Sequence, residues 1–174
     1  MRQARGMELG AKLCLMSEMD GLMPAEKAHF STLFLANHVE VQNGLLYIAG
    51  GGWTYHRRVP VRPDGQRTVS RLGIAGMVKV PWAETNRKQR FLIEVTDQEG
   101  GAQLVKIEGE LNAGRPADLE PGSAQHMPLA ITADTVFAHA GSYVVRGVLN
   151  DDASNALSWE FQVFDLPVPP QAAI

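Results

Sequence analysis

The sequence contains a single cysteine, Cys14, among its 174 residues. One cysteine allows no intramolecular disulfide and supplies too few thiolates for a cysteine-based zinc site. It lies among Leu9, Leu13 and Met16, whose spacing is helical. This setting favours a small buried apolar side chain over a reactive thiol.

Long apolar runs are also lacking, because no stretch approaches the roughly 18 residues needed to cross a bilayer. The start of the chain has no continuous apolar segment before a small-residue cleavage site, so it is a poor secretory signal. We therefore expect a cytoplasmic protein with no membrane segment. Residues 1–26 form an N-terminal extension whose apolar spacing between Met7 and Met19 is compatible with one amphipathic helix, and Met23 is an alternative translation start.

The motifs of the common catalytic and cofactor sites are missing as well. The five histidines show neither HxH nor HExxH spacing, and the sequence has no Gly-x-Ser-x-Gly elbow. The glycine-rich run 50–52 is not followed by the Lys-Ser/Thr of a phosphate loop, so it indicates a bulge or a close backbone approach. We expect no cofactor and assign no catalytic or metal-binding residue, although residues distant in sequence could still converge on a metal.

Two acidic groups have both a functional and a structural interpretation. Asp151 and Asp152, with neighbouring asparagines, could bind Ca²⁺ through loop oxygens, but these are also ordinary turn residues, and we favour the turn. Glu108 and Glu110 share one face of a predicted strand and could act as paired carboxylates. Lys106 lies on the same face, which favours a solvated surface of mixed charge.

What the sequence does contain is alternation of apolar and polar residues with the period of a β-strand. In residues 90–97, Phe91, Ile93 and Val95 point to one face, and the polar residues point to the other. Strands are predicted at residues 30–41, 45–55, 68–80, 89–97, 103–111, 126–133, 142–149 and 157–164. The pattern predicts an all-β protein, an antiparallel immunoglobulin-like β-sandwich of seven or eight strands over residues 27–165, followed by a proline-rich tail at 166–174. Trp159 should belong to its core.

Charge is distributed unevenly along the chain, although the net charge is only −3. Residues 55–90 hold nine Lys or Arg against two acids, a balance of +7, whereas residues 91–174 hold three against twelve, a balance of −9. Solubility alone does not require this split. The cations either bind a partner or pair with the acidic half of the chain.

Several short motifs resemble a family of small uncharacterised bacterial proteins with a domain of unknown function. They are Gly50-Gly51-Gly52-Trp53, Val80-Pro81-Trp82 with Thr85-Asn86-Arg87, residues 91–97 with Gly100, Gly114-Arg115-Pro116, Pro121-Gly122, and Gly141 with Tyr143. The likeness covers roughly residues 27–165 and implies a compact sandwich domain. It transfers no catalytic residue.

These observations favour a non-enzymatic binding or assembly module that engages a protein partner or a second copy of itself through loops or edge strands. Aromatic residues interleaved with the cations make up the candidate interaction surface, which comprises Trp53, Arg57, Arg58, Trp82, Arg87, Lys88 and Arg90. One alternative is a small metal-dependent or small-molecule enzyme with its site in loops at one end of the sandwich. A weaker alternative is nucleic-acid binding through residues 55–90, which the acidic pI of about 5.9 disfavours.

Overall fold

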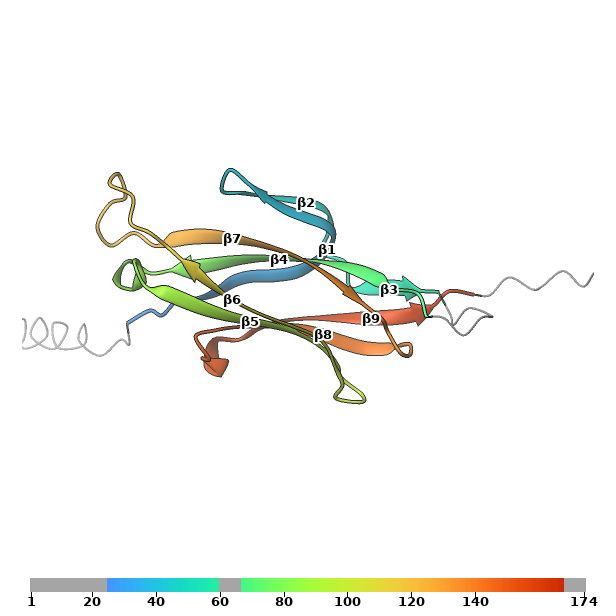
Figure 1. The fold of residues 1–174 in the computed structure, drawn as a ribbon. Helices are drawn as coiled ribbons and strands as arrows, with labels where there is room; N and C mark the ends of the chain where they lie inside the picture. The colour runs from blue at the N-terminus through green and yellow to red at the C-terminus, as the bar shows by residue number, and fades with distance from the viewer. Residues whose placement is uncertain (1–24, 60–66, 168–174) are drawn as a thin grey trace, which may run out of the picture.

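Two β-sheets pack face to face in the computed structural model, which describes residues 25–59 and 67–167 (Figure 1). The first sheet has the strand order β2-β1-β4-β7, and the second has the order β3-β9-β8-β5-β6. The strands are β1 (His29–Gln42), β2 (Leu45–Gly51), β3 (Tyr55–Arg58), β4 (Ser70–Val80), β5 (Lys88–Asp97), β6 (Gln103–Asn112), β7 (Gln125–Thr135), β8 (Gly141–Leu149) and β9 (Leu157–Asp165). Two short 3-10 turns, η1 (Trp82–Glu84) and η2 (Ala153–Asn155), precede β5 and β9.

The predicted all-β sandwich is confirmed, and each of the eight predicted segments contains a strand. The difference is a ninth strand, because the segment predicted as one strand at 45–55 is divided. β2 ends at Gly51, and the backbone there turns through positive φ angles at Gly50 (61°) and Gly52 (79°). β3 then joins the second sheet parallel to β9, so the sandwich is not wholly antiparallel. The predicted N-terminal helix and the prolines at 169 and 170 lie outside the described residues.

The core fills the space between the two sheets with the inward rows of each strand. Leu35, Ile74, Ile93 and Val145 are completely buried, as the alternation in the sequence requires. An aromatic group stands at one end of this core, where the ring of Phe161 contacts those of Tyr143, Phe137 and Trp53.

Trp159 lies at the margin of the core. Its ring is half-buried 6.2 Å from that of Phe34, and its Nε1 donates to the carbonyl of Trp53 at 3.1 Å. It packs against the buried residues as predicted, but it is less enclosed than Phe161.

The hairpin of β1 and β2 leaves the first sheet and folds over its outer face. Pairing of β1 with β4 ends at Ala36 and Gly73, and beyond this point β1 pairs only with β2. Val39 and Leu46 of the hairpin pack on Ala75, whose neighbours on β4 point into the core. Small residues such as Ala75 on the outer face of the first sheet therefore allow the hairpin to pack closely against it.

β6 and β7 are edge strands on the same side of the sandwich. β1 packs across the sheets against β8 and β9, which leaves β7 to lie over β6 at the opposite side. Figure 1 shows both strands along the front of the molecule. Among the described residues, no helix is both long and apolar enough to cross a membrane.

Candidate interaction surface

The seven residues predicted to form an interaction surface lie at two opposite ends of the sandwich. Arg58 pairs with Asp165 at the end of β9, whereas Lys88 lies at the start of β5, at the end of the sheet where β9 begins. Trp53 and Arg57 lie at the same end as Arg58. Trp82, Arg87 and Arg90 lie at the same end as Lys88 (Figure 1). The structure therefore brings together two smaller groups and not one surface.

At the β3 end, Arg58 has a structural role. Its side chain is only 15% exposed, and it donates from Nε to Asp165 at 2.6 Å and from Nη1 to the carbonyl of Phe137 at 2.8 Å. Trp53 and Arg57 line a shallow hollow together with the glycines 50–52, Asn37, Tyr55 and His56. His56 bonds to the Ser70 hydroxyl at 2.9 Å, and burial lowers the pKa of its imidazole.

At the other end, Trp82 is covered by a cation from a distant part of the chain. The guanidinium carbon of Arg115 lies 3.9 Å from the Trp82 ring centroid, within the range of a cation–π contact. Arg115 also donates to the Trp82 carbonyl at 2.8 Å and to the hydroxyl of Thr85 at 2.9 Å. One face of the ring is therefore occupied by the protein itself.

The uneven charge of the sequence is partly balanced by ion pairs within the chain. Four cations of the basic segment 55–90 pair with acids of the C-terminal half in Arg58–Asp165, Arg71–Asp134, Lys88–Glu110 and Arg90–Asp151. Three of these pairs are well exposed, so each contributes little to stability. Their main consequence is that these cations already have an acidic neighbour.

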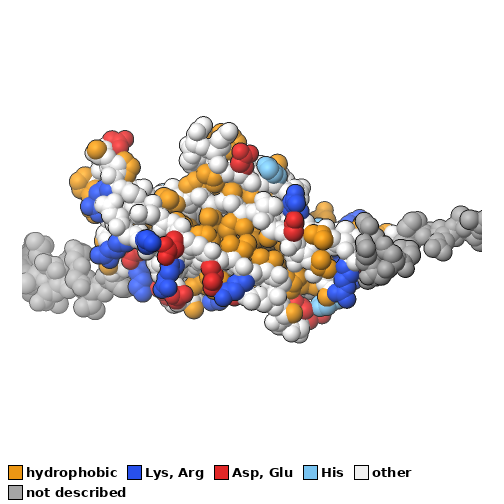
Figure 2. All heavy atoms as spheres, viewed as in Figure 1, with side chains coloured by type: hydrophobic (Ala, Val, Ile, Leu, Met, Phe, Trp, Pro, Cys, Tyr) orange, Lys and Arg blue, Asp and Glu red, His pale blue; other side chains and the backbone are white. Residues whose placement is uncertain are grey.

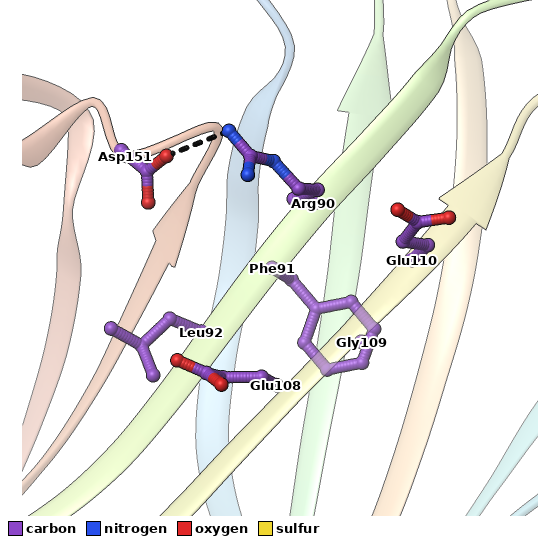
Figure 3. Close-up of a pocket in the computed structure, with 7 residues that line it drawn as sticks. All are labelled: Arg90, Phe91, Leu92, Glu108, Gly109, Glu110 and Asp151. Atoms are coloured by element: carbon purple, nitrogen blue, oxygen red, sulfur yellow. Dashed lines mark hydrogen bonds and ion pairs between the residues drawn. The ribbon is translucent and has the colours of Figure 1, made fainter.

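The two carboxylate groups considered in the sequence have ordinary neighbours. Glu108 pairs with Lys106 at 2.8 Å, and Glu110 pairs with Lys88 at 2.8 Å. With Arg90 and Asp151 they line a shallow hollow, where the ring of Phe91 covers Gly109 (Figure 3). A mixed-charge surface describes them better than an acid-base pair.

The loop between β8 and β9 is an ordered turn. Asn150 and Asp151 take positive φ angles, and Asp152 accepts hydrogen bonds from Ser154 and Asn155. The Ser154 bond and Lys27 lower the pKa of Asp152 to about 2. Within residues 25–59 and 67–167, no three His, Cys, Asp or Glu side chains lie close enough together to hold a metal ion.

One polar pair, between a partly exposed histidine and a buried aspartate, had no signal in the sequence. His139 Nε2 lies 2.8 Å from the carboxylate of Asp97, which is 4% exposed, and the Tyr143 hydroxyl donates to the His139 carbonyl at 2.9 Å. Hydrogen bonds to the Ala140 carbonyl and to Asp97 raise the pKa of His139. The pair ties the loop before β8 to the end of β5.

Partly buried hydrophobic side chains line the open side between β6 and β7. Hydrophobic atoms gather there in the middle of the face shown in Figure 2. The inward rows of the two edge strands supply them, namely Val105, Ile107 and Leu111 from β6 and Met127, Leu129 and Ile131 from β7, all half-buried. β7 carries Pro128 as its fourth residue, whereas β6 contains no proline. Alternation predicted strands at residues 103–111 and 126–133, but not that both would lie at edges.

Comparison with protein families identifies a match to a family of unknown function, DUF6941, over residues 31–163. The chain belongs to the DUF6941 family. The match extends from β1 into β9, so the DUF6941 domain is the sandwich itself, and the resemblance seen in the sequence is confirmed. Comparison with curated proteins finds no relative of this DUF6941 protein.

Proposed function

We propose that this protein is a non-enzymatic binding or assembly module that engages a protein partner, or another copy of itself, through the edge strand β6 and the open side between β6 and β7. The observation that supports the proposal is that, within residues 25–59 and 67–167, two sheet edges without a partner strand coincide with two half-buried apolar rows. A sheet edge presents free backbone donors and acceptors, and an extended segment can add to it as a further strand.

A strand added to β6 would both form backbone hydrogen bonds and bury apolar surface. It would pair with the free backbone groups of β6, and its inward side chains would cover Leu129 and Ile131 across the opening. Completing the burial of an aliphatic side chain that is already largely buried contributes at most about 1 kcal/mol, so the six residues of the two rows together supply at most about 6 kcal/mol.

The two edges differ in their capacity to accept a strand. Proline lacks a backbone N–H, and it is a common device that protects an edge strand from pairing. Pro128 is the fourth residue of β7, and β6 contains no proline. We therefore assign the backbone pairing to β6. β7 contributes only apolar side chains to the proposed interface.

The charge pattern favours a protein partner over a nucleic acid. Binding to phosphates requires cations that can exchange counterions for phosphate oxygens. Arg58, Lys88 and Arg90 of the predicted surface already have acidic neighbours, and the two cationic groups lie at opposite ends.

Selection from a displayed library of random nonapeptides tests the proposal. The folded protein should enrich extended peptides with alternating apolar residues, and Ile107→Lys should reduce their binding by about tenfold or more. Tyr47→Lys is the matched control, because Tyr47 is 48% exposed on β2, an edge strand of the other sheet. Enrichment that survives Ile107→Lys would contradict the proposal, as would the absence of both peptide selection and self-association.

A further inference from the structure

We infer that the strand accepted by β6 is the β6 strand of a second copy, paired antiparallel about a twofold axis that passes through Ile107. This inference rests on the proposed function and names its partner. Closed twofold symmetry is the commonest way in which identical chains associate, and it requires a surface that is complementary to itself.

The charges of β6 are self-complementary in this register. With Ile107 opposite its own copy, Lys106 lies opposite the partner's Glu108, and Glu108 lies opposite the partner's Lys106. Opposite charges in directly opposed cross-strand positions stabilise an antiparallel pair. Lys106 and Glu108 are 49% and 65% exposed, so both are accessible to a second chain.

Neighbouring registers are worse for simple physical reasons. Moving the axis to Glu108 sets this carboxylate opposite its own copy, and moving it to Lys106 sets two ammonium groups together. Like charges in opposed positions are destabilising. A shift that sets Ile107 opposite Glu108 turns the inner faces of the two copies to opposite sides, because directly opposed residues share one face.

The chosen register also covers the apolar opening. The two five-stranded sheets become one continuous ten-stranded sheet whose inner faces lie on the same side. The Leu129 and Ile131 side chains of the two copies then contact each other across the axis, and the two β7 strands form no backbone hydrogen bonds with each other. In this dimer Pro128 needs no N–H, and the backbone of β6 makes the hydrogen bonds between the copies.

Charge reversal with sedimentation equilibrium tests the register. Lys106→Glu and Glu108→Lys should each weaken self-association by about tenfold or more, because each places like charges at both opposed pairs. An equimolar mixture of the two variants should associate, since every opposed pair in the mixed dimer is then complementary. Glu40→Lys on the exposed hairpin is the matched control and should leave association unchanged.

Cysteine cross-linking in a Cys14→Ser background gives the second measurement. Opposed Cα atoms in an antiparallel pair are about 4.5–5.5 Å apart, which a disulfide can bridge. Ile107→Cys should therefore form a disulfide-linked dimer on oxidation. Val105→Cys should not, because the two copies of that residue would be offset by four positions, about 13 Å.

The outcomes separate the two levels of the argument. A dimer that shows the charge pattern and the selective cross-link supports the inference. A monomer that still selects peptides at β6 overturns self-pairing but leaves the proposed function standing. A monomer that selects no peptide overturns both, and a dimer indifferent to the charge variants overturns the assignment of its interface to β6.

Discussion

Gly73 is the position at which the hairpin of β1 and β2 leaves the first sheet, and it gives the sharpest test of the fold. A Cβ added there would lie 2.8 Å from the carbonyl oxygen of Ala36 and 3.3 Å from a methyl group of Val39. The first neighbour is backbone, so it cannot move aside by changing a rotamer. Gly73→Ala must therefore displace β1 at this point.

Gly76 provides a matched control on the same strand. A Cβ there would meet the ring of Phe30 at 3.5 Å, an ordinary van der Waals contact. Replacing a strand glycine by alanine contributes about 0.5–1 kcal/mol by reducing unfolded-state entropy, and this gain is common to both variants. Overpacking costs about 1–3 kcal/mol and falls on Gly73→Ala alone.

The two variants should thus differ by about 1–3 kcal/mol in their free energy of unfolding, with Gly76→Ala the more stable. For a chain of this size, the middle of that range corresponds to about 6 °C in melting temperature. Urea denaturation and thermal melting followed by circular dichroism measure the difference. Equal stability, or a more stable Gly73→Ala protein, would refute the close approach of β1 at this point.

Three further predictions concern the core and two titrating groups. Phe161→Ala should lower the free energy of unfolding by about 3–5 kcal/mol in urea titrations, because this buried ring joins three other aromatic rings. The pKa of Asp152 is lowered in the folded protein, so its contribution to stability is present above the ordinary value of 3.8 and is lost as the pH falls towards 2; Asp152→Asn should flatten the fall in denaturation midpoint over that interval. The pKa of His139 is raised, so its contribution is present below the ordinary value of 6.5 and is lost as the pH rises through the folded value. His139→Gln should remove the loss of stability that begins as the pH rises above 6.5, and an unchanged pH profile would count against the Asp97 pair.

The strands could be predicted from the sequence because alternation reports directly which side chains share a face. Phe91, Ile93 and Val95 lie inward as their spacing requires. β3 was missed because the glycines before Trp53 were interpreted as a bulge within one strand, whereas their positive φ angles carry the chain into the other sheet. Local spacing holds no information about which sheet a strand will join.

The site was harder to predict because it depends on contacts between residues distant in the chain. Arg115 stacks on Trp82 from 33 residues away, and Arg58 reaches Asp165 across 107 residues. No local pattern indicates such pairs. To predict the open side, one must also know which strands lie at the edges of the sheets. Pro128 is the one sequence signal for this, because proline within a sheet is confined to edge strands, strand starts and bulges.

The central claim is that β6 is the edge that accepts a strand, and hydrogen exchange of its backbone amides tests this most directly. Unpaired edge amides exchange rapidly, and pairing with another strand slows them. In the associated or peptide-bound protein, amides of β6 should become protected while those of β2 and the outer edge of β7 remain fast. New protection at β2 or β7, with β6 unchanged, would contradict the account.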